Sequence, residues 1–371
     1  MKVLHFYKTS VPGSMGGIEQ VIHQIGLGAA KQGVQTDVLS LTSKNAPRTV
    51  DAGGYLVHHA RMDVQIASTG FSISALLRFF QLARRADVIH YHFPWPFMDL
   101  VHFLTRINKP TVVTYHSDII RQKHLLKLYR PLKHLFLNDV DRIVATSPNY
   151  LATSQVLARY RDKVSVIPIG LDRETYPKAD PQTLSRWREK VGPKFFLFVG
   201  VLRYYKGLHI LMEAAKGTEF PIVIVGAGPI EDELKEQARS LRLSNVHFFG
   251  QLPESDKVAL LELSYAVVFP SHLRSEAFGI SLLEGAMYGK PMISSEIGTG
   301  TTFINISGET GLVMPPGDPA ALRGAMQYLW EHPEDARILG LQAEERYWKY
   351  FTADRMVTDY ITLYRELVQG R

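Results

Sequence analysis

Two glutamates eight residues apart offer the clearest chemistry in this sequence. Glu276 and Glu284 lie in the segment SEAFGISLLEGAMYGKP, the first in a loop and the second on the helix that follows. Phe278, Gly279 and Ile280 fall at the expected helix start, where backbone N–H groups lack partners within the helix and favour anions. Carboxylates accept hydrogen bonds, such as those from sugar and ribose hydroxyls. The segment therefore suits a sugar that is attached to a diphosphate.

Cations and glycines precede two further helices. In the stretch FVGVLRYYKG, Arg203 and Lys206 lie between an expected strand and a helix, where they can neutralise phosphate charge. A solvated loop is the alternative interpretation of that stretch alone. Farther along, Gly226 in IVIVGAGPIEDEL indicates a tight turn against which a nucleotide base can lie.

The first loop of the chain is also rich in glycine. Gly13, Gly16 and Gly17 separate an expected strand from a helix that begins at Ile18. Glycine lets backbone amides approach an anion, which the helix dipole also favours. The spacing matches neither the dinucleotide fingerprint nor the P-loop, so a plain turn remains the alternative.

Three histidines lie along or just after expected strands. His116 follows the strand VVTY, and at a carboxyl end it can hydrogen-bond a ligand hydroxyl. His90 and His92 alternate along another strand and therefore share one face. They could be a pair of metal ligands, but no third ligand is evident, so we expect them to line a cleft.

The elements that position these residues are short apolar runs alternating with helical periodicity. The runs are rich in Val, Ile and Phe, which is typical of parallel strands buried on both faces. Repeated strand–helix units, built twice, predict an α/β protein with two doubly wound parallel sheets. In such sheets the ligand lies at the carboxyl ends of the strands. We expect strands at residues 2–7, 36–41, 87–91, 111–115, 141–145, 164–167, 195–199, 222–225, 246–249, 266–269 and 291–294.

The length of 371 residues suggests two domains. The polar, proline-bearing stretch 176–188 is the expected boundary, and residues 351–367 resemble one amphipathic helix. The absence of cysteine excludes disulfide scaffolds, cysteine nucleophiles and thiolate metal sites. We expect no signal peptide and no membrane-spanning segment, and hence a cytoplasmic protein.

Charge is divided unevenly along the chain, whose net charge is +6. Residues 1–175 hold 21 Lys+Arg and 12 Asp+Glu, whereas residues 176–371 hold 21 and 24. This asymmetry indicates an anionic partner for the first half. No zinc-finger spacing or basic repeat favours nucleic acid.

Residues 119–137 contain no acidic side chain and read as a basic amphipathic helix, kinked or restarted at Pro131. Such a helix suits an anionic membrane surface, although its apolar stripe fits a domain core equally well. The cations expected to contact the membrane and the acceptor are Arg121, Lys123, Lys127, Arg130 and Lys133.

Together these motifs, in this order and over essentially the whole chain, resemble the retaining GT-B glycosyltransferases of family 4. The resemblance implies sugar transfer from a nucleoside diphosphate sugar with retained anomeric configuration and no metal cofactor. It implies an acceptor-binding domain over residues 1–175, a nucleotide-sugar-binding domain over 176–350, and a helix over 351–371 that packs back toward the first domain. Both domains would be Rossmann-like, facing each other across a cleft.

The resemblance also assigns roles to residues. Glu284 would bind the ribose, and Glu276 the hydroxyls of the donor sugar. The family commonly has arginine where this chain has Val201, so Lys206 is the more secure phosphate ligand. The implied catalytic residues are His116 and Glu276, and the implied donor-binding residues are Gly16, Gly17, Arg203, Lys206, Gly226, Phe278, Gly279, Ile280 and Glu284.

The opening KVLHFYKTSVPGSMGGIEQVIHQ looks like bacterial mannosyltransferases of lipopolysaccharide O-antigen assembly. That likeness implies GDP-mannose or GDP-D-rhamnose as donor, a polyprenyl diphosphate-linked oligosaccharide as acceptor, and a place at the inner face of the cytoplasmic membrane. A UDP-sugar donor is the alternative within this class. Outside it stand a sugar-nucleotide 2-epimerase, which the paired glutamates disfavour, and a noncatalytic lipid-surface adaptor, which the complete set of donor motifs disfavours.

Overall fold

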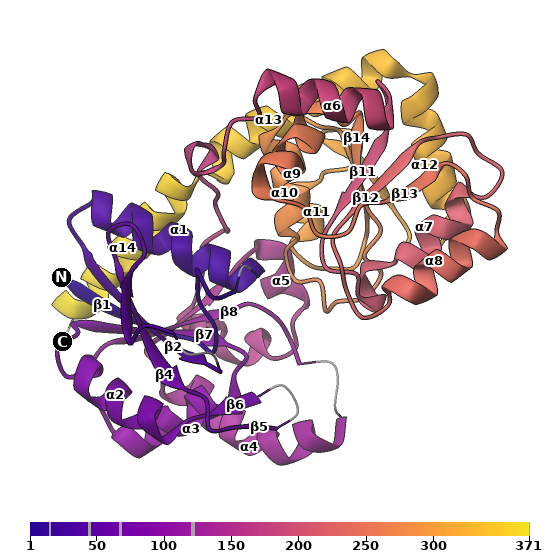
Figure 1. Cartoon of the computed structure of the whole chain (residues 1–371). Coiled ribbons are helices and arrows are strands. Elements are labelled where there is room, and N and C mark those ends of the chain that lie inside the picture. The colour runs from indigo at the N-terminus through magenta and orange to yellow at the C-terminus, as the bar shows by residue number, and fades with distance from the viewer. Residues whose placement is uncertain (15, 44–45, 67–68, 120–122, 371) are drawn as a thin grey trace. The chain divides into compact units, whose positions relative to one another are not determined.

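The chain forms two compact units, and each is built on one large sheet flanked by helices (Figure 1). The computed structural model describes residues 1–14, 16–43, 46–66, 69–119 and 123–370, without the side chains of residues 123–126. Unit 1 comprises Met1–Leu171 with Thr352–Arg371, and unit 2 comprises Asp172–Phe351. The boundaries expected from the sequence were 175/176 and 350/351.

The sheet of unit 1 has eight strands in the order β10-β9-β8-β7-β1-β2-β4-β3. All neighbours are parallel except β3 and β4, and a separate hairpin pairs β5 with β6. The strands are β1 Lys2–Phe6, β2 Gln35–Thr42, β3 Thr49–Asp51, β4 Leu56–Arg61, β5 Val64–Ile66, β6 Thr69–Phe71, β7 Val88–Phe93, β8 Thr111–Tyr115, β9 Arg142–Ala145 and β10 Val164–Val166. The helices are α1 Gly17–Lys31, α2 Ile73–Ala83, α3 Pro96–Thr105, α4 Lys123–Asp139, α5 Pro148–Thr153 and α14 Ala353–Gln369, with a 3-10 segment η1 at Leu157–Lys163.

The sheet of unit 2 has six parallel strands in the order β13-β12-β11-β14-β15-β16. The strands are β11 Phe196–Val199, β12 Ile222–Val225, β13 Val246–Phe248, β14 Ala266–Phe269, β15 Met292–Ser295 and β16 Gly311–Met314. The helices are α6 Pro181–Val191, α7 Leu208–Ala215, α8 Glu231–Ser240, α9 Glu254–Leu263, α10 Ile280–Met287, α11 Thr301–Ile304, α12 Pro319–Glu331 and α13 Pro333–Tyr350, with 3-10 segments η2 Arg173–Thr175 and η3 Tyr204–Lys206.

The predicted class, two doubly wound parallel α/β sheets, is confirmed. Each expected strand is present: β8, β12 and β14 match residue for residue, and the ends of the others shift by a residue or two. The central strands are buried along nearly their whole length because helices cover both faces. The prediction omitted β3, β4, β16 and the β5–β6 hairpin, which are short or, in LVHHAR of β4, rich in polar residues.

The stretch 176–188 is not the linker that its polar composition indicates. Asp180 caps α6 by accepting a hydrogen bond from the backbone N–H of Thr183 at 2.9 Å, and Pro181 occupies the first helical turn. Trp187 on this helix is buried in a core cluster of unit 2. The polar residues therefore form a capped amphipathic helix, and the chain passes between units at Leu171 and Asp172.

The C-terminal helix α14 belongs to unit 1, where it lies along α1. A Cβ atom on Gly28 of α1 would come within 2.6 Å of the Val357 side chain, so glycine permits this close approach. Gln32 Nε2 also donates to Thr358 Oγ1 at 3.1 Å. No helix within the described residues is long and apolar enough to cross a membrane.

Candidate active site

Glu276 is held in an ion pair in the loop that follows β14. The buried Lys206 Nζ in η3, beyond the end of β11, donates to Glu276 Oε2. Ser271 Oγ donates to the same oxygen at 3.2 Å. Within the described residues both bonds end on Oε2, which leaves Oε1 to accept a bond from a ligand. The structure thus brings together two residues that the sequence placed at separate strand ends.

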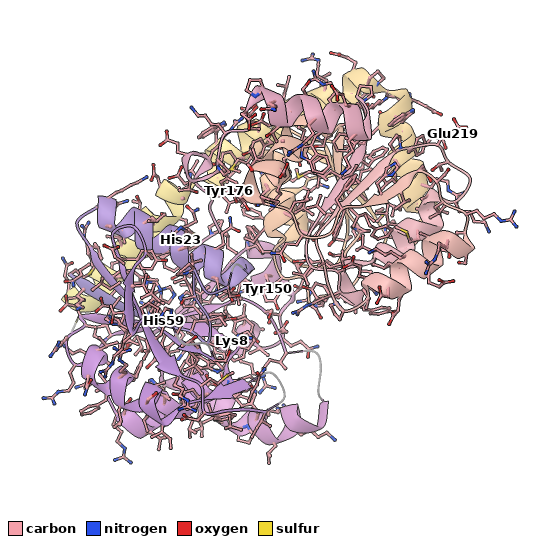
Figure 2. All side chains as sticks on the ribbon, viewed as in Figure 1. Lys8, His23, His59, Tyr150, Tyr176 and Glu219 are labelled. Atoms are coloured by element: carbon pink, nitrogen blue, oxygen red, sulfur yellow. The ribbon has the colours of Figure 1, made fainter. Side chains whose placement is uncertain are left out.

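Glu284 has a second, separate lysine partner. It lies on α10 and is buried, and its Oε1 accepts from Lys257 Nζ at 2.7 Å and from the hydroxyl of Tyr176 at 3.0 Å (Tyr176 is labelled in Figure 2). Burial lowers the pKa of Lys257, but Glu284 and Glu254 outweigh it and raise that pKa to about 12. Lys257 therefore stays charged. Neither Lys257 nor Tyr176 was predicted from the sequence to be a site residue.

The start of α10 is shaped by Gly279. This residue has φ of +99°, a left-handed conformation that favours glycine. The N–H groups of Gly279 and Ile280 belong to the first turn, which has no acceptors inside the helix. Phe278, just before it, is buried and anchors the loop. The arrangement offers backbone donors and the positive end of a helix dipole one turn before Glu284.

The loops after β11 and β12 lie against each other, and Gly226 makes this possible. Its φ is +131°, and a Cβ atom there would stand 2.0 Å from the carbonyl oxygen of Gly200. The backbone N–H groups of Gly200 and Leu202 donate to Val225 and Ala227, each at 3.0 Å. A side chain at position 226 would force these loops apart, so the predicted tight turn is present.

The two predicted phosphate cations differ in their surroundings. Lys206 is buried and paired with Glu276, whereas the side chain of Arg203 is exposed. Val201, at the position where the family commonly has arginine, is half exposed. Lys206 is therefore fixed in place before a ligand binds, and Arg203 is free to change rotamer.

Gly16 is the N-cap of α1 in unit 1 and Gly17 is its first residue, so the helix starts within one residue of the expected position. Glu19, in the first turn, folds back over them: a Cβ atom on Gly16 would lie 2.5 Å from Glu19 Oε2. The Glu19 carboxylate accepts from Thr9 Oγ1 at 2.5 Å and from Ser14 Oγ at 3.4 Å. The helix start that was expected to receive an anion thus already has the Glu19 carboxylate beside it, a contact that was not predicted from the sequence.

His116 lies just beyond β8 and is joined to two more histidines. Its Nε2 is 3.0 Å from His92 Nδ1, and His92 Nε2 is 2.9 Å from His5 Nδ1. His5 was not singled out in the sequence; it meets the others because β1 and β7 are neighbours with His5 opposite His90. Burial lowers the pKa of both His5 and His116 to about 3, so these rings are neutral near pH 7.

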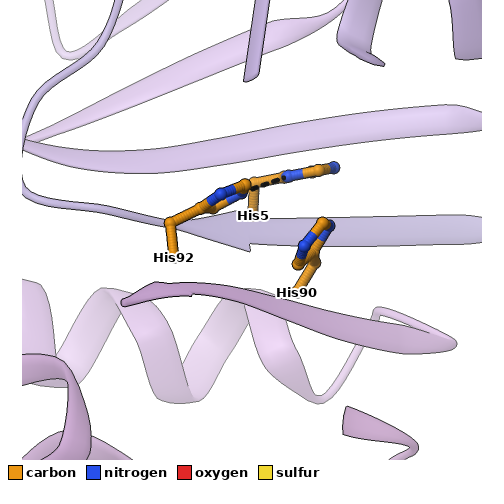
Figure 3. Close-up of side chains that lie close together, drawn as sticks. All are labelled: His5, His90 and His92. Carbon is orange, nitrogen blue, oxygen red and sulfur yellow. Dashed lines mark hydrogen bonds between the residues drawn. The ribbon is translucent and has the colours of Figure 1, made fainter. Parts of the chain in front are cut away.

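His90 and His92 do share one face of β7 (Figure 3). Both side chains are fully buried in the core, so they do not line an open cleft. His90 Nδ1 is 2.6 Å from the hydroxyl of Tyr364, and His90 Nε2 is 2.7 Å from Thr114 Oγ1. Tyr364 comes from α14, so the C-terminal helix buries this histidine.

His5, His90 and His92 place ring nitrogens within 4.8 Å of one another (Figure 3). His5 is therefore a possible third metal ligand, which was not evident in the sequence. A metal needs a bare nitrogen lone pair from each ligand. Both nitrogens of His90 and both of His92 instead engage protein groups. The donor set fits a hydrogen-bonded network better than a metal centre.

The predicted basic helix is present as α4 and runs through Pro131. Lys127 and Arg130 on it are exposed. Lys133 is only 7% exposed, which removes it from the surface offered to a membrane. Arg121 lies outside the described residues, as does the side chain of Lys123.

Comparison with known proteins agrees with this architecture. The model of glycosyl transferases group 1 matches residues 181–346, and that of Glycosyltransferase Family 4 matches residues 15–175. The chain is 65% identical to the D-rhamnosyltransferase WbpZ of Pseudomonas aeruginosa, over 95% of this chain and 93% of that protein. It is 50% identical to the O-antigen chain mannosyltransferase C of Escherichia coli, over 100% of both.

Solved structures show the same fold at low sequence identity. A sucrose-phosphate synthase from Thermosynechococcus elongatus matches with a TM-score of 0.84 and 21% identity, over 100% of both chains. WaaG, a glycosyltransferase involved in lipopolysaccharide biosynthesis, matches with a TM-score of 0.71 and 14% identity, also over 100% of both. With two sheets of the expected topology and both family models matched, the chain belongs to glycosyltransferase family 4 and is a glycosyltransferase of the GT-B fold.

Proposed function

We propose that this glycosyltransferase moves mannose or D-rhamnose from a GDP-linked donor onto a polyprenyl diphosphate-linked oligosaccharide during O-antigen synthesis, with retention of anomeric configuration. The observation that carries the proposal is the 65% identity, over 95% of the chain, to a D-rhamnosyltransferase. The 50% identity to an O-antigen chain mannosyltransferase supports the same class of reaction. D-rhamnose is 6-deoxymannose, so the two donors differ at one hydroxyl, and the higher identity favours D-rhamnose.

The paired glutamates support a role for unit 2 in binding the donor. Oε1 of Glu276 would accept from a hydroxyl of the donor sugar, and the second oxygen of Glu284 from a ribose hydroxyl. Lys206 has three N–H donors, so it can hold Glu276 and still donate to a phosphate. The N–H groups of Gly279 and Ile280 would bind the same diphosphate, with Arg203 reaching it from its exposed position.

The same residues would stabilise the leaving group. As the bond between the anomeric carbon and the phosphate oxygen breaks, its electron pair stays on the diphosphate, where Lys206 and the helix start stabilise the charge. The acceptor hydroxyl attacks from the same face, and its proton passes to that phosphate oxygen. His116 would hydrogen-bond a hydroxyl of donor or acceptor. The cations supply the positive charge that this step needs, so we expect no metal requirement.

The test is transfer with a panel of donors. The full chain is incubated with a lipid-linked acceptor extract and labelled GDP-mannose, GDP-D-rhamnose, UDP-glucose or UDP-N-acetylglucosamine, with and without EDTA. We expect product from a GDP sugar in both conditions, with the anomeric configuration of the donor as read by NMR. Product from the UDP sugars alone, or an inverted linkage, would contradict the proposal.

We further propose that helices α2, α3 and α4 of unit 1 contact the membrane that holds the acceptor. These helices are consecutive neighbours on the surface of unit 1. Leu128 on α4 is 82% exposed and Ile73 on α2 is 75% exposed, and both are large apolar side chains. With the exposed Lys127 and Arg130 beside Leu128, the surface combines apolar insertion with attraction to anionic lipid.

Vesicle binding tests this second proposal. The double variant Lys127→Gln, Arg130→Gln should bind vesicles of phosphatidylglycerol and phosphatidylethanolamine about 30-fold more weakly, at about 1 kcal/mol per cation. A matched variant, Lys178→Gln, Lys216→Gln, removes two exposed cations from unit 2 and should bind like the parent. Equal losses in both variants would show that net charge, and not this surface, governs binding.

A further inference from the structure

Three histidines of unit 1 form a continuous hydrogen-bonded chain that ends at His116. His5 Nδ1 meets His92 Nε2 at 2.9 Å, and His92 Nδ1 meets His116 Nε2 at 3.0 Å. Successive ring planes lie within 20° of parallel, at 19° and 20°. The chain crosses the neighbouring strands β1 and β7 to the residue after β8. In this geometry, the nitrogen that holds the proton on one ring determines which nitrogen holds it on the next ring.

All three rings are enclosed, and only the last has any exposure. His5 and His92 are fully buried, while His116 is 6% exposed. His90 lies against the rings of His5 and His92, and Tyr7 contacts the edge of His92. Burial lowers the pKa of each of the three histidines far enough that they are neutral near pH 7. Each neutral ring has one N–H donor and one bare nitrogen.

A chain of neutral rings has only two consistent arrangements of its protons. Either every Nδ1 has the proton and the bonds run from His5 toward His116, or every Nε2 has it and the bonds run the other way. The two differ at the buried end, where His5 Nε2 has no hydrogen-bond partner in the described part of the chain. The second arrangement would bury an N–H without an acceptor, and buried polar groups without a partner are rare in folded proteins. The first leaves only a bare ring nitrogen there.

We propose that His5 and His92 are positioning residues that hold His116 as its neutral Nδ1–H tautomer, so that this ring offers a hydrogen-bond donor to a sugar hydroxyl. Nε2 of His116 accepts from His92, and Nδ1 makes no bond to any described residue and is not among the fully buried polar atoms without a partner. The link to a sugar hydroxyl rests on the proposed function, whereas the tautomer itself does not. The chain thus fixes the direction of the hydrogen bond at the site from inside the core.

The test is the ¹⁵N spectrum of the histidine rings in the full chain labelled with ¹⁵N-histidine. His116 is assigned by the signal that His116→Gln removes. We expect a protonated Nδ1 and a bare Nε2 on His116 at pH 7. A protonated Nε2 would overturn the proposal whether or not the protein transfers sugar, and a protonated Nδ1 in a protein without transferase activity would uphold it while the proposed function fails.

Variants separate positioning from packing. His92→Leu should convert the His116 signals to a mixture of tautomers and lower the rate of sugar transfer by about 10- to 100-fold, the scale of the loss when a group that orients a metal-ligating histidine is removed. His92→Asn places an amide N–H near the former Nδ1 and should restore the tautomer and most of the rate. His23→Asn, a matched change on α1, should alter neither.

The proposal remains testable even if one variant fails to fold. If His92→Leu fails to fold, the parent spectrum and His92→Asn still report the tautomer. An Nδ1–H signal that persists unchanged in folded His92→Leu would overturn the role of His92, and the same signal unchanged in His5→Leu would overturn that of His5.

Discussion

The two units hold their candidate site residues by different physical means. Unit 2 uses buried ion pairs, Lys206 with Glu276 and Lys257 with Glu284. Unit 1 uses neutral imidazoles that hydrogen-bond one another, His5, His92 and His116. Each ion pair offers a charged donor and a charged acceptor to a ligand. The neutral rings can orient a hydroxyl without adding charge. The difference fits the proposal that the donor diphosphate binds to unit 2 and that His116 of unit 1 hydrogen-bonds a hydroxyl.

Loss of charge in unit 2 should have the largest effect. Glu276→Gln keeps the shape of the side chain but removes the charge that fixes Lys206, so the donor sugar and its phosphate lose their alignment. We expect the rate of sugar transfer to fall by about 100-fold or more, the scale of a misplaced reacting group. Steady-state kinetics with the donor measures this.

Glu231→Gln is the matched control, because Glu231 forms a surface pair with Lys235 on α8. Its rate should stay near that of the parent. If the Glu276→Gln protein is as active as this control, the Lys206–Glu276 ion pair does not hold the site residues of unit 2 in the way we infer.

Removal of Lys257 should chiefly affect the stability of unit 2. Lys257→Met leaves the Glu284 carboxylate, whose side chain is 4% exposed, without its cation. Breaking a buried pair on one side costs about 3 kcal/mol. Urea unfolding should show this loss, while Lys235→Met, which breaks a surface pair, should change the free energy of unfolding by less than about 1 kcal/mol. Equal losses would mean that the Lys257–Glu284 pair behaves like a surface pair.

Acid should destabilise unit 1 in particular. The pKa of His5 and of His116 is lowered to about 3 in the folded chain, whereas unfolded histidine titrates near 6.5. As the pH falls below about 6.5, the unfolded state takes up protons that the folded state refuses, so stability falls by about 1.4 kcal/mol per pH unit for each such histidine. Hydrogen exchange read by mass spectrometry should show peptides of β1, β7 and β8 opening at pH 5 before those of β11 and β14. Equal opening in both units would contradict neutral burial.

The positions of most strands and the parallel α/β class could be predicted from the sequence, because a strand buried on both faces must be apolar along its length. The position of Glu284 on a helix and of Glu276 in the loop before it also follows from local pattern. Lys257 does not, because it reaches Glu284 only through tertiary packing, from a helix 27 residues away. His5 is similar: it joins His92 because β1 and β7 are paired, a fact of strand order.

The burial of individual charged side chains was the property hardest to predict from the sequence. Lys133 fits the basic face of α4 by spacing, yet it is buried. Residues 176–188 read as a linker because they are polar, yet Asp180 and Pro181 begin a helix there. Polar composition describes both solvated loops and the outer faces of capped helices, so local pattern could not separate the two.

Binding of GDP to the full chain, measured by calorimetry, tests the central claim most directly. We predict that GDP binds the parent protein, that Lys206→Met weakens binding by about 10- to 100-fold through loss of a charge-assisted hydrogen bond, and that Lys235→Met leaves it unchanged. A parent protein that does not bind GDP, or a Lys206→Met protein that binds it equally well, would contradict the assignment of the donor diphosphate to unit 2.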